Sequence, residues 1–471
     1  MTHKHTMFEQ IVNQIVEEIQ ALPNRKRLGE ALLPKLTASV ATLVRDSAGL
    51  HLTKAKNQEA SIHKGSGYYT ADRYNKIHTY RIHINRAFNG METLEYLFVT
   101  KKGASDGAAG RFLTRYVATS KLTEMFAGIE PEIISALLPP VDPNAETIIC
   151  QKKVYTGVLN KQGREITRKV LLDYKDNADS ARMRQNLAVI NKVLVKNWFD
   201  FDVTPSELEA VEEEIREKSK ENDYNLHINL ANRSLHRTFN NTEFMHGGRF
   251  YGGWWELVPS KLRSRIVINC KRTEEYDYSG LHPNMLYAME GLAFPSDPYD
   301  DLVKDVPRKA CKVAFNAMLN ATKELKTLPK LNLSQYGTKW AILSSAIMER
   351  HKPIAHHFYT GIGKELQRID SDMAEEVMLF FANERVPVLP CHDSFVMHQG
   401  YQEDLQKLMA KAFRDRFGQE IGIKLECKMP YPSGGGEPVS MSVEDILSGL
   451  EGDCHQRLEV FRDSASNGTS A

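Results

Sequence analysis

Two aspartates, Asp277 and Asp393, occupy positions at which a carboxylate could bind a metal ion or act in catalysis. Asp277 lies near the end of a β-rich run that leads into a predicted helix beginning near Leu281. The mouth of a sheet, where a strand runs into a helix, is a common place for such a carboxylate. Asp277 could equally serve as an ordinary helix-capping residue, because aspartate favours that position.

Asp393 lies in a tight turn between two apolar segments in residues 386–398. These segments read as strands that are too apolar to face water. We therefore expect a buried hairpin that presents one carboxylate at its tip, between His392 and Ser394. The alternative is a structural one, since aspartate favours turns for local reasons.

Residues 307–320 read as a helix with Pro307 in its first turn. Polar side chains recur every four residues along it and share one face. They are Arg308, Lys312, Asn316 and Asn320. The helix offers these cations no acidic partner at the same spacing, so the face suits a polyanion such as a triphosphate. A solvated face is the alternative.

Residues 247–272 combine basic and aromatic side chains. Basic groups bind phosphates and aromatic rings stack on bases, so this composition is typical of a nucleic-acid contact. The basic candidates are Arg249, Lys261, Arg263 and Arg265, and the aromatic ones are Phe250, Tyr251, Trp254 and Trp255. The adjacent tryptophans could instead belong to the core.

Two separated carboxylates, a cationic helix and a basic aromatic segment form the set that two-metal phosphoryl transfer requires. Carboxylates hold paired Mg²⁺ ions, with Mn²⁺ as an alternative, and cations bind the triphosphate. The residues therefore predict a nucleotidyltransferase.

The whole chain has 471 residues, enough for more than one core, and a formal net charge of +1. This net charge does not indicate a nucleic-acid partner. Only local clusters of basic residues can therefore indicate one. No apolar run approaches the roughly 18 residues of a membrane span, and we expect no membrane partner. The six cysteines lie far apart without zinc-ligand spacing, which fits a reducing cytoplasm.

The sequence of the first half of the chain indicates secondary-structure elements but no catalytic or binding residues. Residues 7–21 form an amphipathic pattern, residues 146–172 read as a hairpin that turns near 160–163, and Thr204 with Glu207 predicts a capping box. Composition shifts near 225–240, where we place a domain boundary.

These motifs resemble the superfamily of family A DNA polymerases and bacteriophage-type single-subunit RNA polymerases. Asp277-Tyr278-Ser279 resembles motif A of the DNA polymerases, and Arg308 with Lys312 resembles motif B. His392-Asp393-Ser394 resembles motif C as the RNA polymerases write it, and residues 248–251 are similar to their GRxY segment. The resemblance covers roughly residues 245–450 and does not reach the N-terminal half.

The resemblance implies roles for individual residues. Asp277 and Asp393, with the backbone of Tyr278, would bind the two metal ions. The motif B residues Arg308, Lys312, Asn316 and Asn320 would bind the incoming nucleotide, with His282 beneath its sugar. Nucleic-acid contacts would come from Arg249, Tyr251, Lys261, Arg263, Arg265, Gln367 and His392, and Ser371 accompanies Gln367 on its helix.

The sequence departs from the family pattern at several positions. His282 replaces a glutamate that excludes the ribose 2′-hydroxyl in the DNA polymerases, and Asn320 replaces a tyrosine. Phe315 and Asn316 are transposed, and Ala317 replaces a glycine. The changes at His282 and Asn320 leave the choice of sugar open.

The implied fold is α+β, a right-hand polymerase with an antiparallel palm sheet, helical fingers and a mixed N-terminal, thumb-like region that binds the template. The expected bounds are 1–235 for the N-terminal region, 236–300 and 385–450 for the palm, 301–384 for the fingers and 451–471 for a tail.

The expected function is template-directed addition of nucleotides to a 3′-hydroxyl, with an RNA polymerase slightly favoured. The alternatives are a family A-like DNA polymerase of a phage or mobile element, and a catalytically silent nucleic-acid-binding replication protein. The expected partners are a template, a product strand and nucleoside triphosphates. We expect a monomer in the cytoplasm of the host cell.

Overall fold

The structure is a computed structural model. It describes residues 7–23, 26–52, 59–62, 64, 73–74, 81–103, 105–106, 110–111, 114–126, 145–159, 165–219, 228–294, 297–329, 331–428, 454–455, 457–459 and 461–462. The predicted turn at 160–163 and the end of the predicted palm after residue 428 lie outside the described residues.

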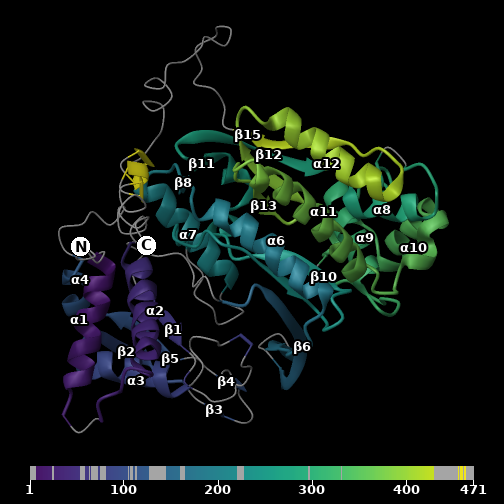
Figure 1. The fold of residues 1–471 in the computed structure, drawn as a ribbon. Coiled ribbons are helices and arrows are strands. Elements are labelled where there is room, and N and C mark those ends of the chain that lie inside the picture. The colour runs from purple at the N-terminus through teal and green to yellow at the C-terminus, as the bar shows by residue number, and fades with distance from the viewer. Residues whose placement is uncertain are drawn as a thin grey trace. The chain divides into compact units, whose positions relative to one another are not determined.

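The chain divides into two compact units. Figure 1 labels their helices and strands. Unit 1 comprises Met1–His236, Tyr251–Thr273 and Cys427–Ala471. Unit 2 comprises Arg237–Phe250 and Glu274–Glu426. Each unit is described by itself below.

Unit 1 begins with three helices, α1 (Met7–Ala21), α2 (Leu33–Leu52) and α3 (Arg81–Thr93), which pack on one another. A small antiparallel sheet has the order β1 (Ala60–Ile62), β5 (Thr114–Ala118), β2 (Leu97–Lys101). The short strands β3 (Ser105–Asp106) and β4 (Gly110–Arg111) pair, and α4 spans Ser120–Glu124. The apolar stripe predicted on α1 is buried in this core: Phe8, Ile11, Val12, Ile15, Val16 and Ile19.

The remainder of unit 1 contains the predicted hairpin, β6 (Ile148–Leu159) with β7 (Glu165–Leu171), which is antiparallel. It also contains α6 (Ala178–Leu194), β8 (Phe199–Phe201), α7 (Pro205–Ser219), η3 (Trp254–Leu257), η4 (Ser260–Arg265) and β11 (Ile266–Ile268). The capping box of α7 is confirmed, since the Thr204 amide donates to Glu207 and the Glu207 amide donates to Thr204 Oγ1.

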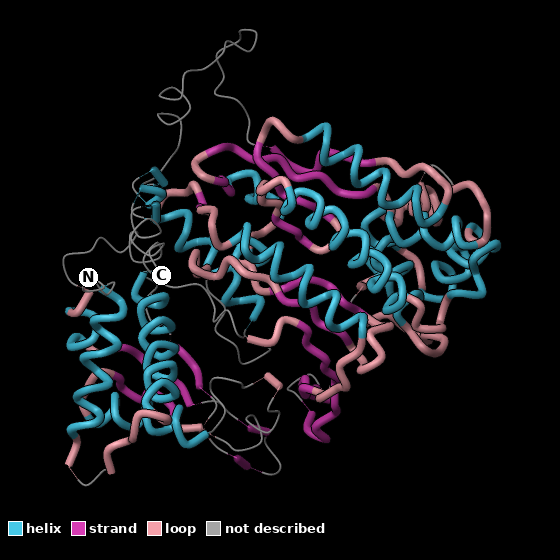
Figure 2. The backbone as a smooth tube through the Cα atoms, in the orientation of Figure 1, coloured by secondary structure: helices cyan, strands magenta, loops and turns pink. Residues whose placement is uncertain are grey.

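Unit 2 contains most of the strands β9 (His236–Phe239) and β10 (Gly247–Tyr251), which are neighbours. A second group consists of β13 (Leu389–Cys391) and β14 (Ser394–His398), with most of β12 (Lys271–Tyr278) and β15 (Ile423–Lys428). β14 lies between β13 and β12, and β15 also pairs with β12. Figure 2 shows these strands beside the helices of the unit.

The helices of unit 2 are α8 (Leu281–Met289), α9 (Arg308–Asn320), α10 (Trp340–Arg350), α11 (Gly363–Asn383) and α12 (Gln402–Phe417), with 3-10 turns η5 (Leu333–Tyr336) and η6 (Lys352–His357). α11 contacts α8, α9, α12 and β13, so it is the central helix. Helical spacing in the sequence predicts that its apolar residues Leu366, Ile369, Met373, Val377 and Phe380 lie in the core. Leu366, Met373 and Val377 are buried, Ile369 is half-buried, and Phe380 is half exposed.

The structure confirms a mixed helix and strand composition with antiparallel sheets. It also confirms the predicted strand, link and helix around Asp277, because β12 ends at Tyr278 and α8 begins at Leu281. Gly280 makes this tight link with a left-handed φ of 64°, which glycine adopts without steric cost. Among the described residues, no helix is both long and apolar enough to span a bilayer.

Candidate active site

The fold brings Asp277 and Asp393 close to one another within unit 2. Asp277 is the penultimate residue of β12, and Asp393 lies in the turn before β14, which neighbours β12 in the sheet. Burial raises the pKa of the Asp277 carboxyl, and the like charge of Asp393 raises it further. A carboxylate in such surroundings is best stabilised by a positive charge.

The hairpin that carries Asp393 is tight and buried, as predicted. Cys391 pairs with Ser394, so His392 and Asp393 form a two-residue turn, and His392 has a left-handed φ of 65°. β13 and most of β14 are buried, whereas His392 is exposed and Asp393 half-buried. The turn therefore directs its polar residues out of an apolar sheet.

A buried contact joins this turn to β12. Ser394 Oγ donates a 2.5 Å hydrogen bond to Glu275 Oε1, and Glu275 is 1% exposed. Glu275 stands two residues before Asp277, and side chains two apart on a strand share a face. Glu275 was not among the predicted site residues, although this alternation is a signal that could have found it.

Lys424 on β15 supplies a positive charge to the pair of aspartates. Its Nζ lies 3.3 Å from Asp277 Oδ2 and 2.5 Å from Glu426 Oε2, and it lowers the pKa of Asp277 against the effects of burial and Asp393. Asp277 Oδ1 is buried and has no hydrogen-bond partner. A buried carboxylate oxygen without a partner beside a second carboxylate is a donor set that suits Mg²⁺, which prefers oxygen ligands.

The polar face of α9 is exposed at Arg308, Lys312 and Asn320. The helix itself offers these cations no acidic partner at that spacing, but Arg308 finds one elsewhere, since its Nε lies 2.6 Å from Asp297 Oδ2. Asp297 lies outside the helix, so helical spacing could not reveal it. Asn320 Nδ2 donates to the backbone oxygen of half-buried Asn316 at 2.8 Å.

Tyr299 lies within electrostatic range of both the α9 face and the aspartates. Burial raises the pKa of its hydroxyl, Arg308 lowers it, and the charges of Asp297 and Asp393 raise it further. The Arg308 guanidinium lies 5.2 Å from the centroid of the Tyr299 ring. Tyr299 therefore contacts Arg308, the first residue of the α9 face.

His282 and Arg249 share one carboxylate. His282 Nε2 lies 2.9 Å and Arg249 Nη2 lies 2.6 Å from Asp370 Oδ2, and Asp370 is buried on α11. The two predicted ligand contacts are therefore members of one ion-pair cluster. Sequence reasoning missed Asp370 because it is distant in the chain from both partners.

The predicted template helix corresponds to α11, where Gln367 is half-buried. Ser371 is fully buried and accepts a 2.8 Å hydrogen bond from Arg237 Nη2. Arg237 is itself fully buried and also donates to Gly248 O and Asp372. Ser371 therefore stabilises the packing of α11 and is not accessible to nucleic acid.

The segment 247–272 is less open to bases than expected. Phe250, Trp254 and Trp255 are buried in the core, so their faces cannot stack on bases, whereas Tyr251 is 37% exposed. The core alternative for the tryptophans is therefore the correct one.

The basic residues of that segment have partners in unit 1. Lys261 Nζ lies 3.3 Å from Glu214 Oε2, Arg265 Nε donates to Asp202 O at 2.6 Å, and Arg263 is half-buried. The site described above is built from unit 2 alone.

Comparisons with known proteins add little to this geometry. No model of a known protein family matches the chain, and no curated protein matches it. A solved structure similar to it is the POL domain of Pol1 from M. smegmatis in complex with DNA primer-template and dNTP. The match has a TM-score of 0.29 and 10% identity and covers 89% of this chain and 65% of that one, so the chain spans about two thirds of that domain's length. A likeness of this degree is too low to assign an activity.

Proposed function

We propose that the protein is a template-directed nucleic acid polymerase that uses two divalent ions, Mg²⁺ or alternatively Mn²⁺. The observation that carries the proposal is the meeting of Asp277, near the end of β12, with Asp393, in the turn before the neighbouring strand β14. The pKa of Asp277 is raised, and its Oδ1 has no hydrogen-bond partner. Nucleotidyl transfer needs carboxylates in this arrangement, because two ions must be held beside the reacting phosphate.

Asp277 and Asp393, with the backbone of Tyr278, would hold the ions. The ions would activate the attacking 3′-hydroxyl and stabilise charge on the leaving pyrophosphate. Arg308 and Lys312 would bind the triphosphate, with Asn316 and Asn320 on the same helix face. Arg308 would exchange Asp297 for the triphosphate, because one guanidinium fork cannot serve both fully.

We assign the palm to residues 236–300 and 385–450, the fingers to 301–384 and a template-binding region to 1–235. Unit 2 contains Asp277, Asp393 and the α9 face, whereas residues 251–273 of the assigned palm belong to unit 1. Template contacts are proposed for Tyr251, Lys261, Arg263, Arg265, Gln367 and His392, of which Tyr251, Lys261 and His392 are exposed. We propose that the protein acts as a monomer in the cytoplasm of the host of a phage or mobile element.

Ribonucleotides are the proposed substrates. His282 replaces a bulky acidic group beneath the sugar, and its bond to Asp370 holds the ring in place. Arg249, on the same carboxylate, balances the charge there. Deoxyribonucleotides are the alternative, to be decided by the assay below.

Primer extension tests the proposal directly. Wild-type protein with Mg²⁺, labelled primer-template and NTPs or dNTPs should add nucleotides, whereas Asp277→Asn and Asp393→Asn should abolish addition and keep template affinity. Asp404→Asn, an exposed aspartate at the start of α12, is the matched control and should retain full activity. Binding without any addition by the wild type would instead identify a silent nucleic-acid-binding protein.

A further inference from the structure

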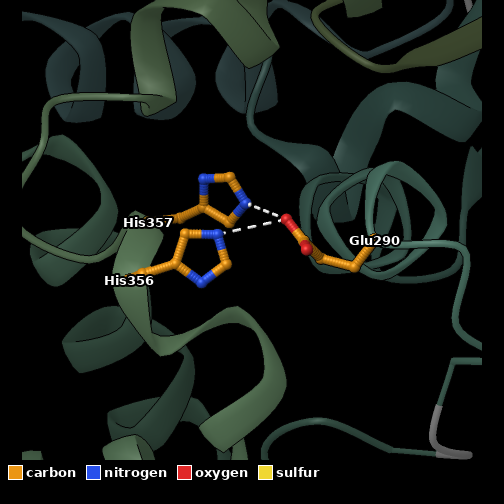
Figure 3. Close-up of side chains that lie close together, drawn as sticks. All are labelled: Glu290, His356 and His357. Atoms are coloured by element: carbon orange, nitrogen blue, oxygen red, sulfur yellow. Dashed lines mark hydrogen bonds and ion pairs between the residues drawn. The ribbon is translucent and has the colours of Figure 1, made fainter.

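Two adjacent histidines and a glutamate converge on the surface of unit 2 (Figure 3). His357 Nε2 lies 2.8 Å and His356 Nε2 lies 3.1 Å from the same oxygen, Glu290 Oε1. One ligand atom from each of the three residues lies within 4.8 Å of the others. Neither the sequence motifs nor the proposed polymerase chemistry uses these residues.

We propose that His356, His357 and Glu290 form a Zn²⁺ site, separate from the Mg²⁺ site at Asp277 and Asp393. Two imidazole nitrogens and one carboxylate oxygen match the ligands and number found in zinc sites that keep a water in the fourth position. Mg²⁺ is a poor occupant, because it prefers an octahedron of oxygen atoms.

The distances suit zinc with little movement. Zn²⁺ binds imidazole nitrogen and carboxylate oxygen at about 2.0–2.2 Å, so neighbouring ligand atoms in a tetrahedron lie about 3.3 Å apart. The His356–Glu290 contact of 3.1 Å is already close to this value, and the His357 contact of 2.8 Å must lengthen slightly. The ion would replace the protons that now join the nitrogens to the oxygen.

The ligands stand on elements that other contacts hold in place. The Tyr287 hydroxyl on α8 lies 3.0 Å from His351 Nδ1, and His351, at the start of η6, is buried. Ile354 on η6 is fully buried, and Thr360 Oγ1 donates to the His357 backbone oxygen at 2.7 Å. Because these ligands are already held in place, they lose less conformational entropy when a metal ion binds.

Electrostatics at Glu290 also favours a cation. Glu290 is the C-cap residue of α8, and a carboxylate at the negative end of a helix is unfavourable unless a positive charge compensates it. The ion would tie the end of α8, the helix that follows Asp277, to η6.

Binding of Co²⁺, a spectroscopic substitute for Zn²⁺, tests the site on the full chain after treatment with a chelator. One equivalent of Co²⁺ should give the visible absorption of a tetrahedral complex, and Zn²⁺ should displace it. His357→Gln and Glu290→Gln should each lower Zn²⁺ affinity by at least about 10-fold, since even indirect metal contacts are worth that much. The exposed side chain of His356 makes His356→Gln a third variant that should fold.

Two matched controls separate this site from others. Glu384→Gln changes the exposed C-cap glutamate of α11, and His246→Gln changes a histidine 3.9 Å from a single carboxylate. Both variants and Asp277→Asn should keep the signal. The proposal is overturned if wild type gives no tetrahedral signal, if the double variant of Glu290 and His357 retains it, or if Asp277→Asn alone removes it. None of these outcomes depends on polymerase activity.

Discussion

The Lys424 ammonium lies 3.3 Å from Asp277 Oδ2, at the point where β15 pairs with β12. This contact opposes the burial and the repulsion from Asp393 that raise the pKa of Asp277. Lys424 also contacts Glu426, so one cation balances several carboxylates. Before an ion binds, the site thus holds more negative charge than its own residues neutralise.

Asp277→Asn should stabilise the protein at pH 8 when divalent ions are absent. The pKa of Asp277 is raised on folding, so its contribution to stability is fully present below the unfolded pKa of about 3.9 and is lost as pH rises through the folded pKa. The asparagine avoids this loss of stability, which is about 1.4 kcal/mol for each unit by which the folded pKa of Asp277 exceeds its unfolded pKa. Urea unfolding of both proteins at pH 8 and pH 4, in the presence of a chelator, measures the difference in stability.

The gain in stability of Asp277→Asn over wild type should disappear toward pH 4. The control variant Asp404→Asn should show no such gain at either pH. A variant that is less stable than wild type at pH 8 would show that Asp277 is held in its ionised form by its neighbours. That outcome would contradict the raised pKa.

Lys312→Ala should weaken binding of the incoming nucleotide and leave template binding unchanged. A charge-assisted contact contributes about 1.5–3 kcal/mol, so KM for the nucleotide should rise about 10-fold or more. Steady-state kinetics and template titration measure the two effects. Lys309→Ala, an exposed neighbour on α9, serves as the control. A loss of template affinity with unchanged KM would assign the face to the nucleic-acid backbone.

His282→Glu should shift the preference of the enzyme toward deoxyribonucleotides. The new carboxylate would restore a bulky group under the sugar, although it would stand close to Asp370, which now lies 2.9 Å from His282 Nε2. Wild type should add ribonucleotides at least as well as deoxyribonucleotides. Single-turnover rates with ATP and dATP measure both. A wild-type preference for dATP above about 100-fold, or about 2.7 kcal/mol, would contradict the RNA polymerase assignment.

Replacing Lys261, Arg263 and Arg265 with alanine should make template binding less sensitive to salt. Each phosphate contact contributes about 0.7–0.9 to the slope of log affinity against log salt, so the slope should fall by about two to three. Glu214→Gln frees Lys261 from its ion pair and should make the slope steeper. Unchanged slopes in both variants would place these residues on a face that does not bind nucleic acid.

The sequence by itself determined the local elements and the chemistry of the motifs. Strand, link and helix around Asp277, the buried hairpin at Asp393 and the cap of α7 all depend on residues close in the chain, and hydrophobic period and turn chemistry report such local preferences. The period also located the buried side of α1. The same pattern wrongly predicts that Phe380 is buried. Periodicity shows which side of a helix is apolar, but it does not show whether a neighbouring element covers every residue on that side.

Only the tertiary structure decided which charges meet. Asp297 beside Arg308, Asp370 between His282 and Arg249, and Lys424 beside Asp277 are contacts between distant segments. No local sequence pattern predicts these contacts, because two residues of an ion pair must be close in space but can be any distance apart in the sequence. The same reason hid the meeting of Glu290 with His356 and His357, where a helix end and a 3-10 turn bring one carboxylate to two imidazoles.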